Sequence, residues 1–206
     1  MLFRSAINHS GADATAIDAK TGEVIKTFPT GKTGEFCQSD GAGKLYVNLE
    51  DSAELLEIDA AKMEVSRKMS LAPCEGPSGL AIDVKSKKLF SVCSNKMMAV
   101  TDIASWKVIA TPAIGASPDA AGFDSTLGLA FSSNGGDGTL TIVKLVNGKY
   151  DAVDSVSTEL RARTMTVDEK LHRVYLLGAD FAAAPAGQKG RPAAVPDSFH
   201  VLVVGK

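Results

Sequence analysis

The residues of this sequence best suited to chemistry are acidic and amide side chains that recur at matching places along it. Four charged residues stand a few positions before a recurring aspartate: Glu35, Glu75, Asp119 and Arg163. Three of them lie five residues before their aspartate, and Glu75 lies eight residues before it. If the repeat brings these side chains to one place, the carboxylates repel one another unless a cation or Arg163 lies between them. The spacing therefore predicts a bound ion, or an anionic group held by Arg163.

The ligands of such an ion are expected among six residues: His9, Glu35, Glu75, Asn95, Asp119 and Asn134. Carboxylate and amide oxygens suit Ca²⁺ or another hard cation, and the histidine nitrogen adds the alternative of Zn²⁺. The alternative that these residues only form turns stays open, because Asn, Asp and Glu are common in turns.

Two functions follow from this set of residues. In the first, the chain is a binding module that takes a small ligand or a divalent cation. In the second, the metal polarises an ester, a lactone or a phosphoester and activates water. The catalytic residues of that hydrolase would be Glu35, Glu75, Asp119 and Arg163, with Arg163 stabilising the developing negative charge.

Charge, hydropathy and local motifs argue against several other kinds of protein. The net charge is −2 and no basic stripe is present, so we expect no nucleic-acid partner. Apolar runs are only a few residues long, so we expect no membrane partner. The opening residues, MLFRSAINHS, lack the features of a signal peptide, which predicts a cytoplasmic protein. The GGDG stretch at 135–138 is typical of a hairpin turn rather than a phosphate-binding loop.

The cysteines leave three interpretations. Cys74 and Cys93 could form a disulfide that closes a loop of about 20 residues, which requires an oxidising compartment. They could bind zinc together with Cys37 or His9, although no CxxC spacing supports this. They could also be small buried apolar residues.

The elements that must position these residues follow from a repeat. Residues 73–112 hold four short apolar runs bounded by turn residues, which is typical of an antiparallel four-strand meander. One aspartate closes the first run of each unit at spacings of 43, 41 and 44 residues: Asp40, Asp83, Asp124 and Asp168. A second closes the third run at spacings of 41 and 43 residues: Asp18, Asp59 and Asp102. A four-strand unit of this length is typical of a β-propeller blade.

Several segments also resemble a known family, the YVTN-type β-propeller repeat proteins of bacteria. They include KLYVNLEDSAELLEIDAAKMEV, GLAIDVKSKKLFSVCSNKMMAVTDIASWKVIATPAIG, GLAFSSNGGDGTLTIV, RTMTVDEKLHRVYL and FHVLVVGK. The resemblance implies the propeller fold and assigns no activity. Family members usually carry an export signal, so the resemblance implies a member that is shortened at its N-terminus.

The expected architecture is a single all-β propeller domain over residues 1–206. Its blade units lie at about 1–30, 31–72, 73–115, 116–159 and 160–206, with a long loop at 178–198. Counting the runs predicts three, four, four, four and three strands, so the first and last blades are incomplete. The five short blades could close on themselves within one chain. Because open strand edges invite pairing, we expect instead a homo-oligomer that completes them.

Overall fold

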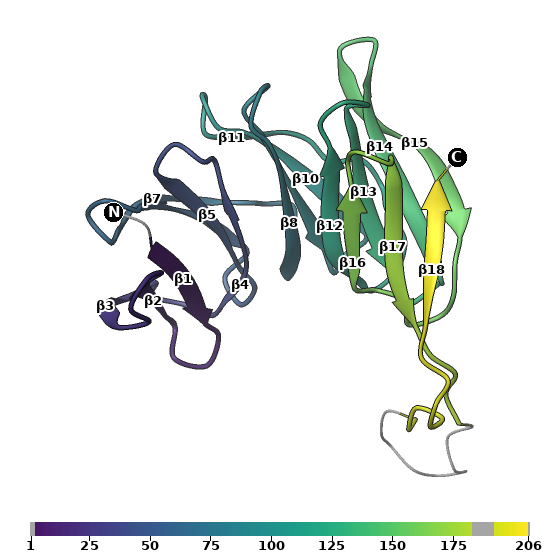
Figure 1. Cartoon of the computed structure of the whole chain (residues 1–206). Helices are drawn as coiled ribbons and strands as arrows, with labels where there is room; N and C mark the ends of the chain where they lie inside the picture. The colour runs from purple at the N-terminus through teal and green to yellow at the C-terminus, as the bar shows by residue number, and fades with distance from the viewer. Residues whose placement is uncertain (1–2, 183–191, 206) are drawn as a thin grey trace.

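The computed structural model describes residues 3–182 and 192–205, which form eighteen strands in five antiparallel sheets (Figure 1). The first sheet contains β1 (Phe3–Asn8), β2 (Asp13–Asp18) and β3 (Val24–Pro29). The second contains β4 (Gly34–Ser39), β5 (Lys44–Leu49), β6 (Glu54–Asp59) and β7 (Glu64–Ser70). The third contains β8 (Pro77–Asp83), β9 (Lys88–Cys93), β10 (Met97–Asp102) and β11 (Lys107–Ala110).

The two remaining sheets follow the same plan. The fourth contains β12 (Pro118–Asp124), β13 (Leu129–Asn134), β14 (Thr139–Val146) and β15 (Lys149–Ser157). The fifth contains β16 (Met165–Asp168), β17 (Arg173–Gly178) and β18 (His200–Gly205). The predicted all-β class and the strand count of each blade are confirmed. No helix of the described residues is long and apolar enough to cross a membrane.

The sheets succeed one another as the blades of a propeller. The first strands of the second to fifth blades, β4, β8, β12 and β16, contact one another in turn, and the other strands of each blade follow outward in sequence order. Figure 1 shows the five blades following one another from the purple N-terminal sheet to the yellow strand β18. Because strand direction alternates, each loop after a second strand lies on the same face as the entry to the next blade.

Aspartate-capped turns produce the repeat. The Asp18 carboxylate accepts backbone N–H bonds from Lys20 at 2.7 Å and Thr21 at 3.0 Å. These donors lower the pKa of Asp18, because they stabilise its charged form. Six further aspartates accept turn amides in the same way: Asp40, Asp59, Asp83, Asp102, Asp124 and Asp168. The period seen in the sequence is therefore a period of turn capping.

Buried apolar side chains form four clusters, and each cluster lies between two neighbouring blades. The buried residues include Leu80, Phe90, Val92, Phe131 and Val174. Three partly buried residues pack against these clusters: Ile82, Phe123 and Leu202. The blades thus pack against one another through the apolar residues that alternate along their strands, as expected for sheets packed face to face.

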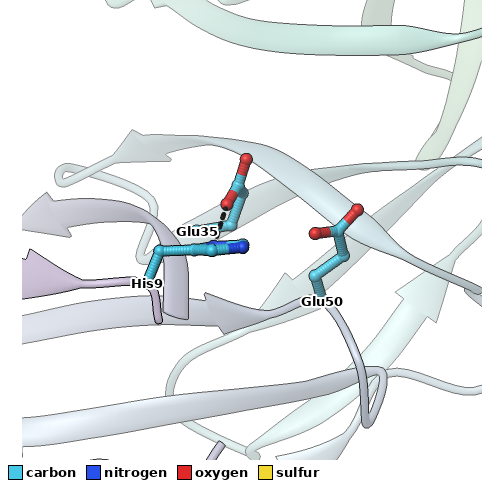
Figure 2. A group of neighbouring side chains, drawn as sticks. All are labelled: His9, Glu35 and Glu50. Atoms are coloured by element: carbon cyan, nitrogen blue, oxygen red, sulfur yellow. Dashed lines mark ion pairs between the residues drawn. The ribbon is translucent and has the colours of Figure 1, made fainter. Parts of the chain in front are cut away.

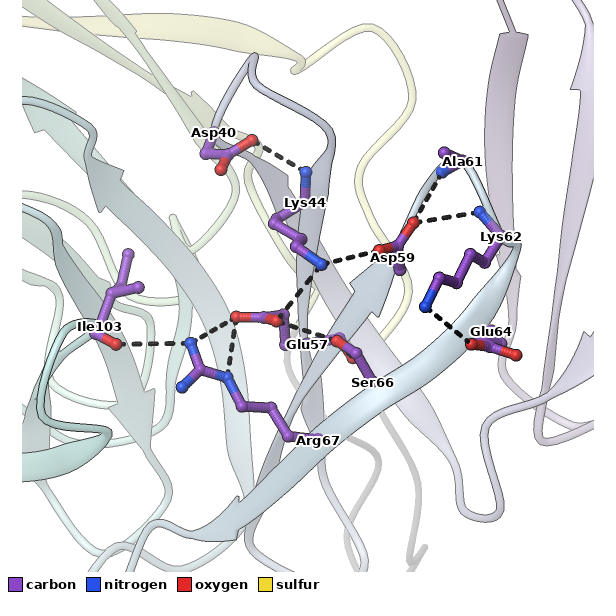
Figure 3. A network of polar contacts seen from close by, with 10 residues as sticks. All are labelled: Asp40, Lys44, Glu57, Asp59, Ala61, Lys62, Glu64, Ser66, Arg67 and Ile103. Atoms are coloured by element: carbon purple, nitrogen blue, oxygen red, sulfur yellow. Dashed lines mark hydrogen bonds and ion pairs between the residues drawn. The ribbon is translucent and has the colours of Figure 1, made fainter.

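One buried ionic contact reinforces the junction of the second and third blades (Figure 3). Glu57 on β6 is only 5% exposed and receives two hydrogen bonds from Arg67 on β7, at 2.9 and 2.6 Å. The Arg67 guanidinium also lies 4.1 Å from the ring centre of Trp106 and donates to the Ile103 carbonyl at 3.5 Å. Arg67 therefore holds a buried charge in one blade while it contacts the next.

The last blade carries several exposed apolar side chains. Leu177, Val201 and Val203 are 43%, 48% and 54% exposed. In the part of the chain that the structure describes, β18 has no further strand beside it. Pairing of this blade with a second copy stays a prediction.

The structure joins Cys74 and Cys93 in a disulfide across 19 residues of sequence. Removing it in a Cys74→Ala/Cys93→Ala double variant should lower the free energy of unfolding by about 3 kcal/mol, because the unfolded chain regains loop entropy. Urea unfolding of the variant and the oxidised wild type measures this difference. Cys37→Ala, which removes the free cysteine on β4, is the control. Equal unfolding midpoints for the double variant and the wild type would contradict the prediction.

Candidate functional site

Three ionisable side chains converge where the first and second blades meet (Figure 2). His9 Nδ1 lies 2.9 Å from Glu35 Oε2, and Glu50 contributes a second carboxylate. One ligand atom from each residue lies within 4.8 Å of the others. The His9 side chain is 54% exposed and that of Glu35 is 32% exposed, so solvent reaches the group.

The strand order explains why these residues meet. His9 is the first residue after β1 and Glu50 is the first residue after β5, while Glu35 is the second residue of β4. The backbone N–H of Glu50 donates to the Thr33 carbonyl at 3.2 Å, which holds the loop after β5 against the entry to β4. All three side chains therefore come from one face of the propeller.

An imidazole nitrogen beside two carboxylates is a donor set that Zn²⁺ and similar divalent metals accept. The spacing of the ligand atoms lets one ion contact all three residues. Because the group comprises three protein ligands, a metal held there would keep coordination positions for water or a ligand. Without an ion, the contact of His9 with Glu35 is an ion pair whenever the histidine is protonated.

Two further predicted site residues, Asp119 and Arg163, contact each other. Asp119, just inside β12, faces Arg163 with 3.6 Å between the carboxylate oxygen and the guanidinium nitrogen. This pair links the entries of the fourth and fifth blades. Asp119 is therefore neutralised by Arg163 and does not belong to the three-residue group at the first junction.

Glu75, Asn95 and Asn134 are used differently from the prediction. Glu75 is exposed, and its backbone N–H donates to the Asn95 side chain at 3.1 Å. The Asn95 amide in turn donates to the Pro73 carbonyl at 2.8 Å. Asn134 is fully buried and its amide donates to Thr139 and Thr141. Both amides fix loops and strands, so they are not free to coordinate an ion.

The cysteines do not supply a zinc site. Cys74 and Cys93 are joined to each other, which removes the thiolates that such a site requires. Burial raises the pKa of the Cys37 thiol to about 11, so this side chain stays protonated at neutral pH. Of the cysteine interpretations, the disulfide is the one the structure adopts.

Glu50 is the member of the group that was not among the predicted ligands. A signal for it exists, because Glu50 follows His9 by 41 residues, the same spacing that separates Asp18 from Asp59. His9 and Glu50 are thus equivalent residues of successive blades. This equivalence to His9 is the signal that would have added Glu50 to the predicted ligands.

Comparison with solved structures supports the class of protein that the blades define, a β-propeller. No family model and no curated protein matches the sequence. Hydrazine synthase from Kuenenia stuttgartiensis has a TM-score of 0.69 at 16% identity, covering 95% of this chain and 57% of that one. Dihydro-heme d1 dehydrogenase NirN, solved in complex with DHE, has a TM-score of 0.67 at 14% identity, covering 95% and 44%.

The WD40 domain of coronin from Toxoplasma gondii is similar to the same degree. Its TM-score is 0.68 at 14% identity, covering 86% of this chain and 50% of that one. The chain thus spans about half the length of these three structures. At such identities the likeness is one of fold.

Proposed function

We propose that this chain is part of a β-propeller binding module that holds a divalent metal ion through His9, Glu35 and Glu50. The observation that carries the proposal is the convergence of their three ligand atoms within 4.8 Å on an accessible face. The three side chains come from two successive blades, so a bound ion would also tie the first blade to the second.

The donor set favours a transition metal over Ca²⁺. Calcium takes six to eight oxygen ligands, whereas this group offers one nitrogen and two carboxylates. Zn²⁺ accepts both kinds of donor in a site of three protein ligands and one open position. Because the imidazole must be deprotonated to bind a metal, protons compete with the ion, and we expect binding to weaken as the pH falls.

Titration calorimetry with Zn²⁺ and Ca²⁺ tests the site. We expect one Zn²⁺ per chain, bound at least about tenfold more tightly than Ca²⁺. Glu35→Gln and Glu50→Gln should each weaken Zn²⁺ binding by about tenfold or more, since each removes a charged ligand. Glu64→Gln is the matched control, because the Glu64 side chain is 56% exposed and its one ion pair among the described residues is with Lys62, at 3.9 Å. Unchanged Zn²⁺ affinity in both site variants would refute the proposal.

A second candidate is metal-dependent hydrolysis of esters, lactones or phosphoesters. The feature that favours it is the small number of protein ligands, which leaves room for an activated water on the ion. p-Nitrophenyl acetate, γ-butyrolactone and p-nitrophenyl phosphate are suitable probes, each with and without EDTA. Turnover that EDTA abolishes and that Glu50→Gln lowers would support hydrolysis. If the zinc-loaded protein turns over none of these probes, hydrolysis is ruled out and metal binding remains the proposed function.

A further inference from the structure

A pocket of about 630 Å³ lies between the fourth and fifth blades and shares no residue with the group at the first junction. This volume falls within the range of sites for small organic ligands. The pocket is built from the entry to β12, the turn between β13 and β14, the connection from β15 to β16, and the residues Phe181 and Pro192. It therefore lies on the same face of the propeller as His9, Glu35 and Glu50.

Two arginines on the connection between β15 and β16 line this pocket: Arg161 and Arg163. Among the described residues, the only ion pair that either forms is the 3.6 Å contact of Arg163 with Asp119. The Arg161 guanidinium lies 4.6 Å from the ring centre of Phe181. Stacking on an aromatic ring fixes the guanidinium plane and leaves its edge N–H groups able to donate. The pocket thus presents positive charge that the protein neutralises only in part.

The backbone at Arg161 has a conformation that recurs in the blades. Its φ is +72°, in the left-handed region that favours glycine. The equivalent residues of the third and fourth blades, Gly76 and Ser117, have φ values of +50° and +48°. Each of the three lies seven positions before the first aspartate of its blade. The fifth blade therefore places an arginine where the local conformation favours glycine.

Two glycines allow the arginine connection to approach the floor of the pocket. The Arg161 N–H donates to the Gly135 carbonyl at 2.7 Å. A Cβ on Gly135 would lie 2.9 Å from the Cβ of Arg163, and one on Gly136 would lie 2.8 Å from Ser117 Oγ. A side chain at Gly135 would therefore displace the arginine connection, whereas one at Gly136 would displace the entry to β12. The two glycines thus allow both walls to approach the turn that forms the pocket floor.

The pocket also has apolar walls. Leu160 is 65% exposed and Phe181 is 38% exposed, and Pro192 completes this side. Cationic donors beside apolar walls suit a ligand that carries an anionic group on an apolar body. A simple inorganic anion would leave these walls uncovered.

We propose that this pocket binds a small organic acid. Arg161 and Arg163 hold its carboxylate, and its apolar body packs against Leu160 and Phe181. Arg161 contributes more than Arg163 to binding of the carboxylate, because Asp119 competes with the ligand for Arg163. The proposal stands independently of the cation site at the first junction.

Titration calorimetry with phenylacetate on the intact chain tests the charge requirement. We expect phenylacetate to bind at least about tenfold more tightly than 2-phenylethanol, which has the same body without the carboxylate, since charged hydrogen bonds contribute at this level. Inorganic phosphate should bind more weakly than phenylacetate, because it leaves the apolar walls uncovered. Equal binding of phenylacetate and 2-phenylethanol, or equal binding of phosphate and phenylacetate, would overturn the proposal.

Three variants localise the ligand. Arg161→Gly should weaken phenylacetate binding by about tenfold or more while the melting temperature stays the same or rises, because glycine suits the left-handed conformation. Asp119→Asn should strengthen binding, since it frees Arg163. Lys170→Ala, in the turn between β16 and β17 on the opposite face, removes the same charge and should leave the affinity unchanged. A loss of affinity with Lys170→Ala equal to that with Arg161→Gly would contradict a local site.

Discussion

Replacing Phe90 with alanine is expected to lower the free energy of unfolding by about 3–5 kcal/mol. Phe90 on β9 is only 1% exposed and belongs to the cluster between the third and fourth blades. Its ring stacks on Phe123 with centroids 5.2 Å apart and meets the edge of Tyr150 at 5.6 Å. Alanine would remove the buried ring, break both aromatic contacts and leave a cavity between two blades that cannot easily close together.

Urea unfolding followed by circular dichroism measures this loss. Phe36→Ala is the matched control, since Phe36 is 38% exposed and its truncation should cost less than about 1 kcal/mol. Should Phe90→Ala fail to fold, Phe90→Leu retains part of the buried volume and should give a smaller, measurable loss. A Phe90→Ala variant as stable as Phe36→Ala would show that the Phe90 ring does not stabilise the packing of the third blade against the fourth.

Replacing Arg67 with alanine is expected to destabilise the protein by about 3 kcal/mol, because Glu57 would remain buried without its main partner. Burial alone raises the pKa of Glu57, but hydrogen bonds from Arg67 and Ser66 and the charges of Arg67 and Lys44 outweigh it and lower the pKa. Lys44 Nζ stays 3.7 Å from the Glu57 carboxylate, which keeps the expected loss at the lower end for a broken buried pair. The variant also loses the contact of Arg67 with Trp106.

The pH dependence of this loss has a definite sign. In the wild type the lowered pKa of Glu57 adds stability that is present above the unfolded-state value near 4.5 and is lost as the pH falls through the folded pKa. In Arg67→Ala the main cause that lowers the pKa of Glu57 is removed, so this pKa should rise and protonation should relieve the buried charge at a higher pH. We therefore expect the stability difference between the two proteins to narrow as the pH is lowered from 7 towards 4.

Two further variants separate the buried pair from an ordinary surface charge. Lys68→Ala removes the neighbouring cation, whose exposed contact with Glu54 spans 3.5 Å, and should cost less than about 1 kcal/mol. Glu57→Gln combined with Arg67→Ala should recover part of the loss, since no charge is then left buried. Equal stability of Arg67→Ala and Lys68→Ala would disprove the role assigned to Glu57.

Part of the candidate site could be predicted from the sequence. The sequence repeat predicted His9 and Glu35 among the ligands of one site. Whether their side chains touch depends on how neighbouring blades pack. The residue after the second strand of one blade meets the entry to the next blade, so His9 reaches Glu35 and Gly135 lies against Arg163. These contacts arise from the way neighbouring blades pack, so residue spacing along the sequence does not predict them.

The cysteine pair illustrates the same limit. The sequence left three interpretations open for Cys74 and Cys93. Choosing among them depends on whether two sulfur atoms come within bonding distance, which the packing of β9 against the segment before β8 decides. Pairing is a matter of a few ångströms, whereas the sequence pattern locates a side chain only to a strand end.

By itself, the sequence determined the fold class, the eighteen strands and the blade period. These features depend on local physics that recurs: a period of two in apolar residues builds each strand, and an aspartate followed by turn residues ends it. Only the tertiary structure decided which charges meet. Equivalent residues of successive blades lie on one face, but their partners differ, so Glu35 pairs with His9 while Asp119 pairs with Arg163. Charge interactions fall off with distance, and the few ångströms that decide them are set by packing between blades.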